Sequence, residues 1–379
     1  MKVAFYAPLK PPDHPAPSGD RQLARALLQA LRAGGHDATV ASRFRTFDAR
    51  GEADRQSRLR ALGERIARRL VDRYRRMDAP PDAWFTYHLY HKAPDWLGPP
   101  VSRALGIPYV VAEASVAGKQ RNGPWAIGYA GSVAAVGAAD AIVFVNPVDV
   151  AGVRNVPRAS GVEEMLPAFL DLSAFTPTVA TRRARDARAS GRVQMVAVAM
   201  MRPGAKLASY RVLASALARI PSDTWNLVIV GDGPARADVK AAFAGFDGER
   251  VRFAGAQPAD RVAALLRDSD LFVWPAVEEA FGMALIEAQA CGVPVVAGNA
   301  GGVSAVVAAG RSGVLVPVAD PDAFAMATER LLRDAGLRER MGREALAYVR
   351  DRHDLPVAAS RIDALLRRVV AARAQSAAP

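Results

Sequence analysis

The strongest constraint on this chain is the alternation of short apolar segments with helical patterns along almost its whole length. The apolar segments have the length and composition of buried strands. The expected strands are Lys2–Ala7, Asp37–Ser42, Ala83–Tyr87, Pro108–Ala112, Ala141–Val145, Val193–Ala199, Asn226–Val230, Arg250–Phe253, Asp270–Trp274, Val293–Ala297 and Gly313–Val316. The clearest helices between them are Asp20–Ala33, Leu207–Arg219, Pro234–Phe243, Ala259–Arg267 and Met283–Cys291. This alternation predicts doubly wound parallel sheets, with enough strands for two.

A chain of 379 residues is too long for one ordinary hydrophobic core, so two domains are expected. We expect one Rossmann-like domain over residues 1–176 and a second over 190–356. The joint is placed in the Thr-, Arg- and Ala-rich segment Thr176–Arg192, and a C-terminal helix at about 357–373 is a candidate to pack back on the first domain. Parallel sheets bind ligands beyond the carboxyl ends of their strands, which suggests a ligand between the two domains.

Other features limit the class of protein. The N-terminal residues MKVAFYAPLKPP are typical of a first strand followed by a loop, not of a signal peptide. No run of about 18 uncharged apolar residues predicts a membrane-spanning helix. The single cysteine, Cys291, rules out an internal disulfide framework and fits a buried thiol in a reducing compartment. We therefore expect a cytoplasmic protein.

One basic segment stands out against a formal net charge of +12: Arg55 to Met77 carries nine arginines and two acids. Its apolar residues recur at helical spacing, which predicts an amphipathic basic helix. They are Leu59, Leu62, Ile66, Leu70 and Tyr74. Two interpretations stay open: a surface helix packed on a sheet, or a patch that binds an acidic acceptor or the anionic lipid headgroups of the inner membrane face. Nucleic acid is not expected, since stacking aromatics are not interleaved with the arginines.

A candidate anion site lies in AMMRPGAKLASYR, Ala199 to Arg211, which follows an expected strand and opens a helix. Arg202 and Lys206 flank Gly204 on this turn. Two cations beside a helix N-terminus suit a diphosphate, although solvated loop charges are the alternative.

A second segment could complete this anion site: VEEAFGMALIE, Val277 to Glu287. The backbone amides of 282–285 are expected to lie unpaired in a first helical turn and, with the positive helix end, to bind an anion. Glu279 would repel phosphate, so it must face a neutral hydroxylated group or solvent. Glu287, one turn into the helix, can accept hydrogen bonds from ribose hydroxyls. Together these groups fit a nucleotide-diphosphate sugar.

Two further motifs are weaker. Gly231-Asp232-Gly233 follows a strand, as in a dinucleotide-binding turn, but Arg236 occupies the position that requires a small residue. A tight turn with some ligand contact is the better interpretation. Asp268 and Asp270 could share a divalent ion, but one ends a helix and the other opens a strand, so no metal site is expected.

These motifs closely resemble those of retaining glycosyltransferases of family 4, which have the GT-B fold. The resemblance rests on Glu279, seven residues and Glu287, followed by AQACGVPVVAGNAGG, and on PSGDRQLARALLQALRAGGHDATV, LPAFLDLSAFTP, LVIVGDGP and VRFAGAQP. It covers most of the chain and implies two Rossmann-like, doubly wound parallel-sheet domains that face a central cleft. It does not specify the donor or the acceptor.

The resemblance also implies residue roles. Arg202 and Lys206 would neutralise the leaving diphosphate, and Glu287 would bind the ribose. Glu279 and the amides around the helix start would hold the transferred sugar, while the turn after Phe253 would lie near the base. The implied donor-binding residues are Gly19, Gly255, Ala256, Phe281, Gly282, Met283, Ala284 and Glu287.

The chain departs from the family at the end of the fourth strand, where many relatives carry a histidine and this chain has Glu113. Glu113 is a candidate to hold the sugar or acceptor, with a structural role as the alternative. His88 and His91, at the end of an aromatic-rich strand, are more typical of packing. His14, in the proline-rich loop, is a weaker candidate for the acceptor site.

The sequence therefore predicts transfer of a sugar from a nucleotide-diphosphate donor to a hydroxyl of a glycan or lipid-linked acceptor, in cell-surface polysaccharide or glycolipid synthesis, without a cofactor or metal. Fixed cations and helix amides supply the leaving-group stabilisation that this reaction needs. Two alternatives stay open: an epimerase or hydrolase of the same fold, and a non-catalytic binding subunit.

Overall fold

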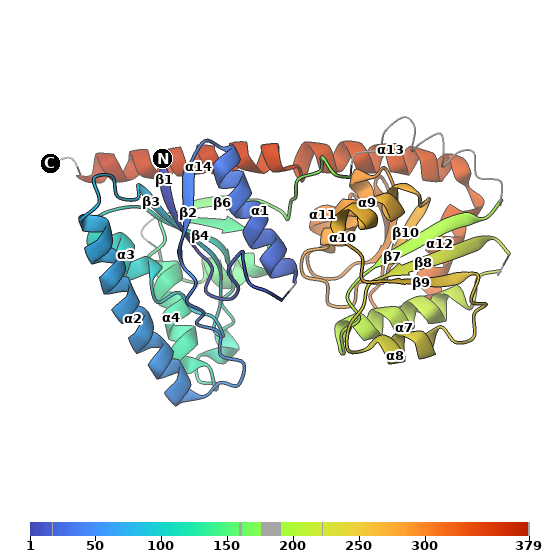
Figure 1. Ribbon diagram of the computed structural model, residues 1–379, viewed down its shortest axis with the longest axis horizontal. Helices are drawn as coiled ribbons and strands as arrows, with labels where there is room; N and C mark the ends of the chain where they lie inside the picture. The colour runs from blue at the N-terminus through green and yellow to red at the C-terminus, as the bar shows by residue number, and fades with distance from the viewer. Residues whose placement is uncertain (17, 159–160, 176–190, 222, 378–379) are drawn as a thin grey trace. The chain divides into compact units, whose positions relative to one another are not determined.

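The computed structural model describes residues 1–16, 18–158, 161–175, 191–221 and 223–377. The chain forms two compact units. The N-terminal unit contains Met1–Pro167 and the final segment from Leu355, and the C-terminal unit contains Ala168–Asp354. Each unit has its own parallel sheet covered by helices on both faces (Figure 1). The predicted fold class, GT-B with two Rossmann-like doubly wound sheets, is confirmed.

The N-terminal unit has a six-stranded sheet in the order β2-β1-β3-β4-β5-β6 among its described residues. The strands are β1 (Lys2–Tyr6), β2 (Asp37–Ser42), β3 (Ala83–Leu89), β4 (Tyr109–Ala114), β5 (Ala141–Phe144) and β6 (Val162–Met165). The helices are α1 (Gly19–Ala33), α2 (Ala53–Arg75), α3 (Gly98–Leu105), α4 (Ala126–Gly137), α5 (Val150–Arg154) and α14 (Leu355–Ala377), with 3-10 turns η1 (Gly118–Gln120) and η2 (Pro147–Asp149). Helices α1 and α14 pack on each other, whereas α2 packs on α3 and α4.

The core of this unit is rich in aromatic side chains, and one buried carboxylate, Asp95, binds polar groups within it. Asp95, only 2% exposed, accepts hydrogen bonds from the Tyr109 hydroxyl at 2.8 Å, the Thr86 hydroxyl at 2.6 Å and the amides of Leu97 and Gly98 at 2.8 Å. Burial raises the pKa of Asp95 in spite of these bonds, which favour its ionised form. Asp95 thus fixes the start of α3 against the ends of the strands.

The C-terminal unit has a six-stranded sheet in the order β12-β11-β10-β7-β8-β9, again counted over described residues. The strands are β7 (Val193–Val198), β8 (Trp225–Val230), β9 (Val251–Gly255), β10 (Leu271–Trp274), β11 (Val295–Gly298) and β12 (Gly313–Val316). The helices are α7 (Ala205–Leu217), α8 (Arg236–Ala242), α9 (Ala259–Arg267), α10 (Met283–Ala290), α11 (Val303–Val306), α12 (Pro321–Arg333) and α13 (Ala335–Arg352). The chain runs outward from β7 to β9 and returns to β10 on the other side of β7. The strand order therefore reverses between β7 and β10.

The units divide at slightly different places from the expected domain boundaries. Residues from Ala168 belong to the C-terminal unit, because the Leu170 amide donates to the His353 carbonyl at 3.0 Å and the Leu172 amide lies 3.4 Å from an Asp354 carboxylate oxygen. The expected joint, Thr176–Arg192, falls almost entirely on 176–190, outside the described residues.

The predicted basic helix is present as α2, two residues earlier than expected at each end. Its buried side chains include Ala67, Leu70, Val71 and Tyr74. The expected apolar stripe is buried only in its C-terminal half, since Leu62 is 36% exposed. The end of α2 follows the amphipathic pattern, whereas its beginning leaves apolar surface exposed.

Candidate functional site

The two cations expected to bind a diphosphate lie where the β7–α7 loop enters α7. Arg202 is in the loop, and Lys206 is in the first turn of α7. Gly204 caps the helix with φ 82° and ψ −135°, a conformation that side chains other than glycine adopt only with strain. Nothing lies within 4 Å of a Cβ built at Gly204, so conformation and not space requires the glycine. Arg202 is exposed, and the Lys206 side chain is 26% exposed. Helix α7 begins two residues before the predicted start at Leu207, so Lys206 lies inside the helix and not on the turn.

Lys206 pairs directly with Glu279, whose carboxylate oxygen Oε2 lies 2.5 Å from Lys206 Nζ. The indole N–H of Trp274 donates to the same oxygen at 3.2 Å, and Nζ lies 5.4 Å from the Trp274 ring centroid. Tyr210 packs edge-on against Trp274 with ring centroids 5.0 Å apart. Sequence reasoning placed Lys206 and Glu279 at one site but missed their contact and the role of Trp274. No sequence signal marks a pair that is 73 residues apart.

The loop between β10 and α10 is held in a strained conformation. Ala276 and Glu278 have φ of 54° and 55°, in the left-handed region that costs a residue with a side chain about 1–3 kcal/mol. The Val277 amide between them donates to the hydroxyl of Ser209, which is fully buried on α7, at 2.9 Å. Contacts with α7 therefore fix the loop that carries Glu279, as expected where strain is stored at a functional site.

Glycines after β11 let this loop pack tightly from its other side. A Cβ at Gly301 would lie 2.1 Å from the Glu279 carbonyl oxygen, and one at Gly302 would lie 2.1 Å from that of Ala280. The Gly302 amide donates to the Glu279 carbonyl at 3.1 Å. The AGNAGG segment of the sequence thus supports the Glu279 loop with its backbone.

Helix α10 directs its N-terminus to the same region. Gly282 caps it in the left-handed conformation, with φ 65°. Within the described residues, the amides of Met283 and Ala284 have no hydrogen-bond acceptor. The prediction was wrong for Leu285, whose amide donates to the Gly282 carbonyl at 2.9 Å because the first turn tightens. The remaining amides, with the positive helix end, are the groups available there to an anion.

The other predicted donor-binding residues lie nearby in the fold. Phe281 is buried before the cap of α10, and Glu287 is half-buried one turn into that helix. Gly255 ends β9 with φ 70°, and its carbonyl accepts a hydrogen bond from the Gly231 amide at 2.8 Å. Ala256 follows in the β9–α9 loop. These positions lie at or beyond the carboxyl ends of β9 and β10.

The Gly231-Asp232-Gly233 turn has a structural explanation. A Cβ at Gly231 would lie 1.9 Å from the Ala199 carbonyl oxygen, and one at Gly233 would lie 2.3 Å from that of Met201. The Met201 amide also donates to the Asp232 carbonyl at 2.9 Å. These glycines bring the turn against the loop that carries Arg202 and precedes Lys206, so the glycines are explained by close packing.

Several sequence candidates have internal partners. His14 accepts from the Ala16 amide at 3.1 Å and lies 3.2 Å from Arg45 Nη1, which holds the proline-rich loop. Asp270 accepts from the Gln194 amide at 2.8 Å and so joins β10 to β7. Within the described residues, no group of three or more His, Cys, Asp or Glu side chains is placed to hold a metal ion.

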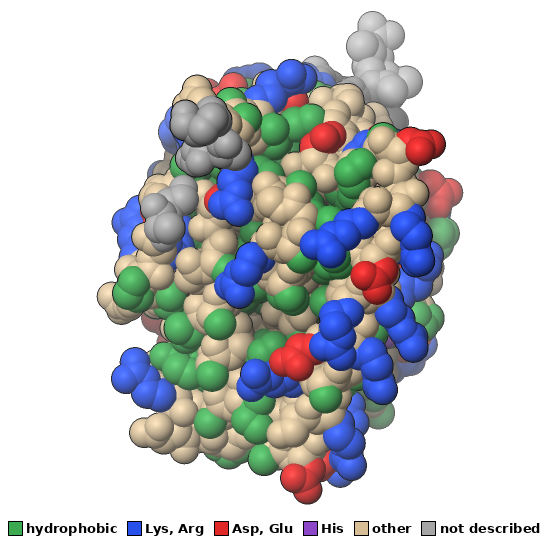
Figure 2. All heavy atoms as spheres, turned by 90° about the vertical axis from the view of Figure 1, so that its left-hand side faces the viewer, with side chains coloured by type: hydrophobic (Ala, Val, Ile, Leu, Met, Phe, Trp, Pro, Cys, Tyr) green, Lys and Arg blue, Asp and Glu red, His purple; other side chains and the backbone are tan. Residues whose placement is uncertain are grey.

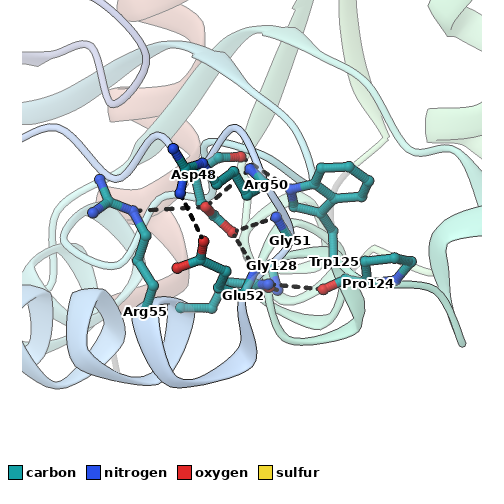
Figure 3. Close-up of polar contacts among 9 residues, drawn as sticks. Asp48, Arg50, Gly51, Glu52, Arg55, Pro124, Trp125 and Gly128 are labelled. Atoms are coloured by element: carbon teal, nitrogen blue, oxygen red, sulfur yellow. Dashed lines mark hydrogen bonds and ion pairs between the residues drawn. The ribbon is translucent and has the colours of Figure 1, made fainter.

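A second polar network lies at the start of α2 (Figure 3). The buried carboxylate of Asp48 accepts from the amides of Arg50, Gly51 and Glu52 at 3.0–3.2 Å, and the Asp48 carbonyl accepts from the Trp125 indole at 2.9 Å. These bonds join the loop after β2 to the loop after β4. The Asp48 carboxylate is thus occupied by the backbone that it orders.

The remaining predicted residues, Gly19 and Glu113, belong to the N-terminal unit. Gly19 begins α1 behind its cap, Ser18. Glu113 lies near the end of β4, is 6% exposed and has φ 58°. Sequence reasoning missed the contact between His88 Nδ1 and Asp20 Oδ1, 3.1 Å apart. The sequence did hold a signal for this contact: Asp20 follows Gly19, and His88 lies at the end of β3, which pairs with the strand before α1.

The C-terminal site lies where the strand order reverses. Strands β7 and β10 are neighbours, so the loop with Arg202, which leads into α7 and Lys206, and the loop with Glu279 leave the sheet side by side. Ligands of doubly wound sheets bind at this switch point. Residues 201–347 match the family model for Glycosyl transferases group 1. The matched segment therefore contains Arg202 and Lys206, the Glu279 loop and α10 with Glu287.

Curated relatives align over part of the chain. The D-inositol 3-phosphate glycosyltransferase of Rhodococcus jostii (strain RHA1) is 37% identical over 141 residues, which are 36% of this chain and 31% of the relative. The enzyme of the same name from Salinispora arenicola (strain CNS-205) is 35% identical over 199 residues, 48% of this chain and 44% of the relative. The chain thus spans less than half the length of these relatives.

Solved structures match the fold over nearly the whole chain. Sucrose-phosphate synthase from Thermosynechococcus elongatus has a TM-score of 0.73 at 20% identity and covers 98% of this chain and 100% of its own. An α,α-trehalose-phosphate synthase from Burkholderia xenovorans, in complex with glucose-6-phosphate, has a TM-score of 0.67 at 13% identity and covers 96% and 99%. These similarities establish the fold of both units.

Proposed function

We propose that this protein is a glycosyltransferase that moves a sugar from a nucleotide-diphosphate donor to an acceptor hydroxyl. One observation carries the proposal. Lys206, Glu279 and the N-terminus of α10 lie at the point between β7 and β10 where the strand order of the C-terminal sheet reverses. The match of residues 201–347 to the glycosyltransferase group 1 model supports it.

In this proposal the diphosphate is neutralised by protein groups alone. Lys206 has three N–H donors, so it can keep its bond to Glu279 and still donate to phosphate oxygens. Arg202 adds a second cation, and the amides of Met283 and Ala284 add oriented dipoles. Such fixed groups stabilise the developing charge of the leaving group without reorganisation. We therefore propose that no metal is required.

The same arrangement suggests which residues bind the sugar, the ribose and the base of the nucleotide-sugar donor. Glu279 and the backbone of 281–283 hold hydroxyls of the transferred sugar, and Glu287 accepts hydrogen bonds from the ribose. The turn at Gly255 and Ala256 lies near the base. In the N-terminal unit, Gly19 approaches the diphosphate or acceptor, and Glu113 contacts the sugar or acceptor.

We further propose a retaining reaction of the family 4, E-x7-E type, in which the new bond forms on the face that the diphosphate leaves. Glu279 is engaged by Lys206 and Trp274, which favours hydroxyl binding over nucleophilic attack. Two alternatives stay open. An epimerase or hydrolase would release or alter the sugar without an acceptor, and a binding subunit would not turn over at all.

For the acceptor we propose a small phosphorylated sugar or polyol in place of the glycan or lipid-linked acceptor expected from the sequence. Support comes from the relatives named D-inositol 3-phosphate glycosyltransferase and from the structural neighbours sucrose-phosphate synthase and trehalose-phosphate synthase.

A lipid-linked acceptor at the inner membrane face is a second candidate, favoured by α2 alone. All nine arginines between Arg55 and Arg76 are exposed, and apolar Leu62 and Met77 are exposed beside them. Figure 2 shows many Lys and Arg side chains on the side of the N-terminal unit where α2 lies in Figure 1. No helix among the described residues is long and apolar enough to cross a membrane. Each arginine near an anionic surface contributes at most about 1 kcal/mol.

Co-sedimentation with vesicles separates these two acceptor classes. Wild type and a variant with Arg68, Arg69, Arg75 and Arg76 changed to Glu are compared at several anionic lipid contents and salt concentrations. A membrane-bound enzyme sediments with anionic vesicles at low salt, and the variant stays in solution. Equal behaviour of the two proteins removes the membrane from the proposal.

Donor binding tests the proposed function itself. Thermal unfolding is followed with a panel of nucleoside diphosphates and nucleotide-diphosphate sugars, for wild type and for Arg202→Ala. One donor class is expected to raise the Tm of wild type, since ligands stabilise the folded state they bind, and to raise that of the variant less. If no compound shifts the wild-type Tm at millimolar concentration, the proposal fails.

A further inference from the structure

A compact polar cluster lies at the carboxyl ends of β3 and β4 in the N-terminal unit. It consists of His88 on β3, Glu113 on β4 and Asp20 in the first turn of α1. His88 Nδ1 lies 3.1 Å from Asp20 Oδ1. In the strand register, Tyr87 pairs with Ala112 and Leu89 with Ala114, so His88 and Glu113 are neighbours on adjacent strands.

Both strand residues adopt a left-handed backbone in the middle of a parallel pairing. The φ angles are 59° at His88 and 58° at Glu113. Each such residue costs about 1–3 kcal/mol, and neither is a glycine that would relieve the strain. Backbone strain of this kind persists where it serves a site, which points to the direction that it gives to the two side chains.

Glu113 has unused hydrogen-bonding capacity. Its residue is 6% exposed, and among the described residues its Oε2 atom has no hydrogen-bond partner. The Tyr87 hydroxyl lies close enough to influence Glu113 but outside hydrogen-bond geometry. A buried carboxylate oxygen without a partner costs on the order of 1–3 kcal/mol or more. The cluster is not sealed, because the side chains of His88 and Asp20 are 16% and 28% exposed.

We propose that Glu113, His88 and Asp20 form a subsite that binds one hydroxyl of a sugar or polyol acceptor. Glu113 Oε2 accepts the hydrogen bond from that hydroxyl, and His88 and Asp20 are positioning residues that hold the carboxylate in place. The assignment to the acceptor rests on the proposed glycosyltransferase function, whereas the subsite itself rests on the geometry of the cluster.

The charges around Glu113 favour a neutral hydroxyl over an ion. The titratable groups that face it are His88 and Tyr87 from β3, Asp20 from α1 and Asp149 from η2. Three carboxylates disfavour a phosphate, and these side chains do not form a metal-holding group. The imidazolium of His88 offsets part of the negative charge, which disfavours a free cation. A hydroxyl adds no net charge to the cluster.

The pKa values of the cluster agree with this geometry. Burial alone would lower the pKa of His88, but the carboxylates of Glu113 and Asp20 raise it to about 9. Burial raises the pKa of Glu113 to about 7, against the lowering effect of His88. Burial also raises the pKa of Asp149. Glu113 therefore gains its accepting, ionised form as the pH rises through about 7, while His88 keeps its charge.

The kinetic test uses Glu113→Gln. The control is Glu64→Gln, the same substitution on α2 of the same unit. Glu113→Gln is expected to raise the acceptor KM about tenfold to a hundredfold, because a buried hydrogen bond to an ionised group is lost. Nucleotide affinity stays at the wild-type value, and so does the acceptor KM of Glu64→Gln. Asp20→Asn gives a smaller rise in KM, and the acceptor kcat/KM of wild type rises with pH through about 7. Equal acceptor KM values for the two Gln variants overturn the subsite.

A second readout does not depend on turnover. The chain has five histidines, so the His88 ring proton can be assigned in a ¹H–¹³C spectrum by comparison with His88→Asn. Glucose, glucose 6-phosphate and myo-inositol are the probes, and at least one is expected to shift the His88 signal of wild type but not that of Glu113→Gln. If none shifts it up to 0.1 M, Glu113 has an ordered water as its partner and the subsite is wrong. If wild type uses no donor but a probe shifts His88, the subsite stands and the proposed function fails.

Discussion

Lys206 shows how a single residue joins two parts of the proposed site. Its ammonium is held by Glu279 and lies near the Trp274 ring, so it is positioned before any ligand binds. A charge that is already in place adds more to leaving-group stabilisation than one that must move there. Trp274 is 2% exposed and donates a hydrogen bond to Glu279, so this buried ring helps to fix the positions of Glu279 and Lys206.

Replacing Lys206 should therefore affect the reaction much more than the fold. We predict that Lys206→Met lowers kcat by about 10²–10³, since the loss of one preorganised group costs about 3–4 kcal/mol in such sites. Arg340→Met, at an exposed position on α13, serves as the control and should keep wild-type turnover. Steady-state rates with saturating donor measure both. Near-normal kcat in Lys206→Met would remove Lys206 from the leaving-group role.

At the scale of elements, the site depends on loops packed backbone to backbone. The turn after β8 lies against the loop after β7, and the glycines after β11 lie against the Glu279 loop. Small residues at these contacts set the positions of functional side chains that they do not touch. A Cβ at such a contact must displace the loop that carries the cations or the carboxylate.

Gly231→Ala tests this packing. The new Cβ would lie 1.9 Å from the Ala199 carbonyl oxygen, at a φ of 143°. We predict a destabilisation of about 2 kcal/mol or more and weaker donor binding, since overpacking shifts the backbone. Gly248→Ala, with nothing within 4 Å of its Cβ, should change stability by less than about 0.5 kcal/mol. Thermal unfolding of both variants measures this; equal Tm values would contradict the packing account.

His353, at the end of α13, makes the stability of the fold depend on pH. Its ring is fully buried, Nδ1 lies 2.7 Å from the Ala168 carbonyl, and burial lowers its pKa from 6.5 to about 4. The folded protein keeps this ring neutral while the unfolded chain takes up a proton below about pH 6.5. Stability is thus highest above that pH and falls as the pH drops towards 4, by at most about 3 kcal/mol from this group.

We predict that His353→Gln has a flatter dependence of unfolding free energy on pH between 6.5 and 4.5 than wild type. The exchange removes the buried titrating group, so the slope that it contributes disappears. Denaturant unfolding at several pH values measures the difference, with His14→Gln as the control. Parallel curves for wild type and His353→Gln would show that His353 does not carry this slope.

At the scale of the whole molecule, the fold could be predicted from the sequence because buried parallel strands are continuous apolar runs. Asp37–Ser42, Gly313–Val316 and the helix Ala259–Arg267 have the predicted bounds. Strand β6 was missed, since Val162–Met165 contains two acids and lacks an apolar run. Strand ends were also predicted too short at β3 and β4.

The site was predicted less completely, for a physical reason. The positions of loops follow from the order of the strands. Once a parallel sheet was assumed, the sequence therefore predicted that Lys206 and Glu279 belong to one site. Their direct contact depends on the path of a strained loop, which no periodicity encodes. The His88–Asp20 contact likewise depends on left-handed residues inside strands, and a sequence pattern does not reveal these.

Metal independence is a property of the whole proposed enzyme. We predict that the initial rate of transfer is unchanged in excess EDTA, because Arg202, Lys206 and the α10 amides neutralise the diphosphate. The rate is compared before and after addition of chelator, and again with added magnesium or manganese. Loss of activity that either ion restores would reverse this prediction.

The most direct test of the central claim is a time course of the wild-type reaction by ¹H NMR, with the donor found by thermal unfolding and a small phosphorylated sugar or polyol as the acceptor. The account predicts that a nucleoside diphosphate accumulates together with a new glycoside, and that the anomeric proton of the product has the same configuration as that of the donor sugar. Release of the diphosphate with an inverted product would contradict the retaining mechanism. No release from any nucleotide-diphosphate sugar would contradict the function itself.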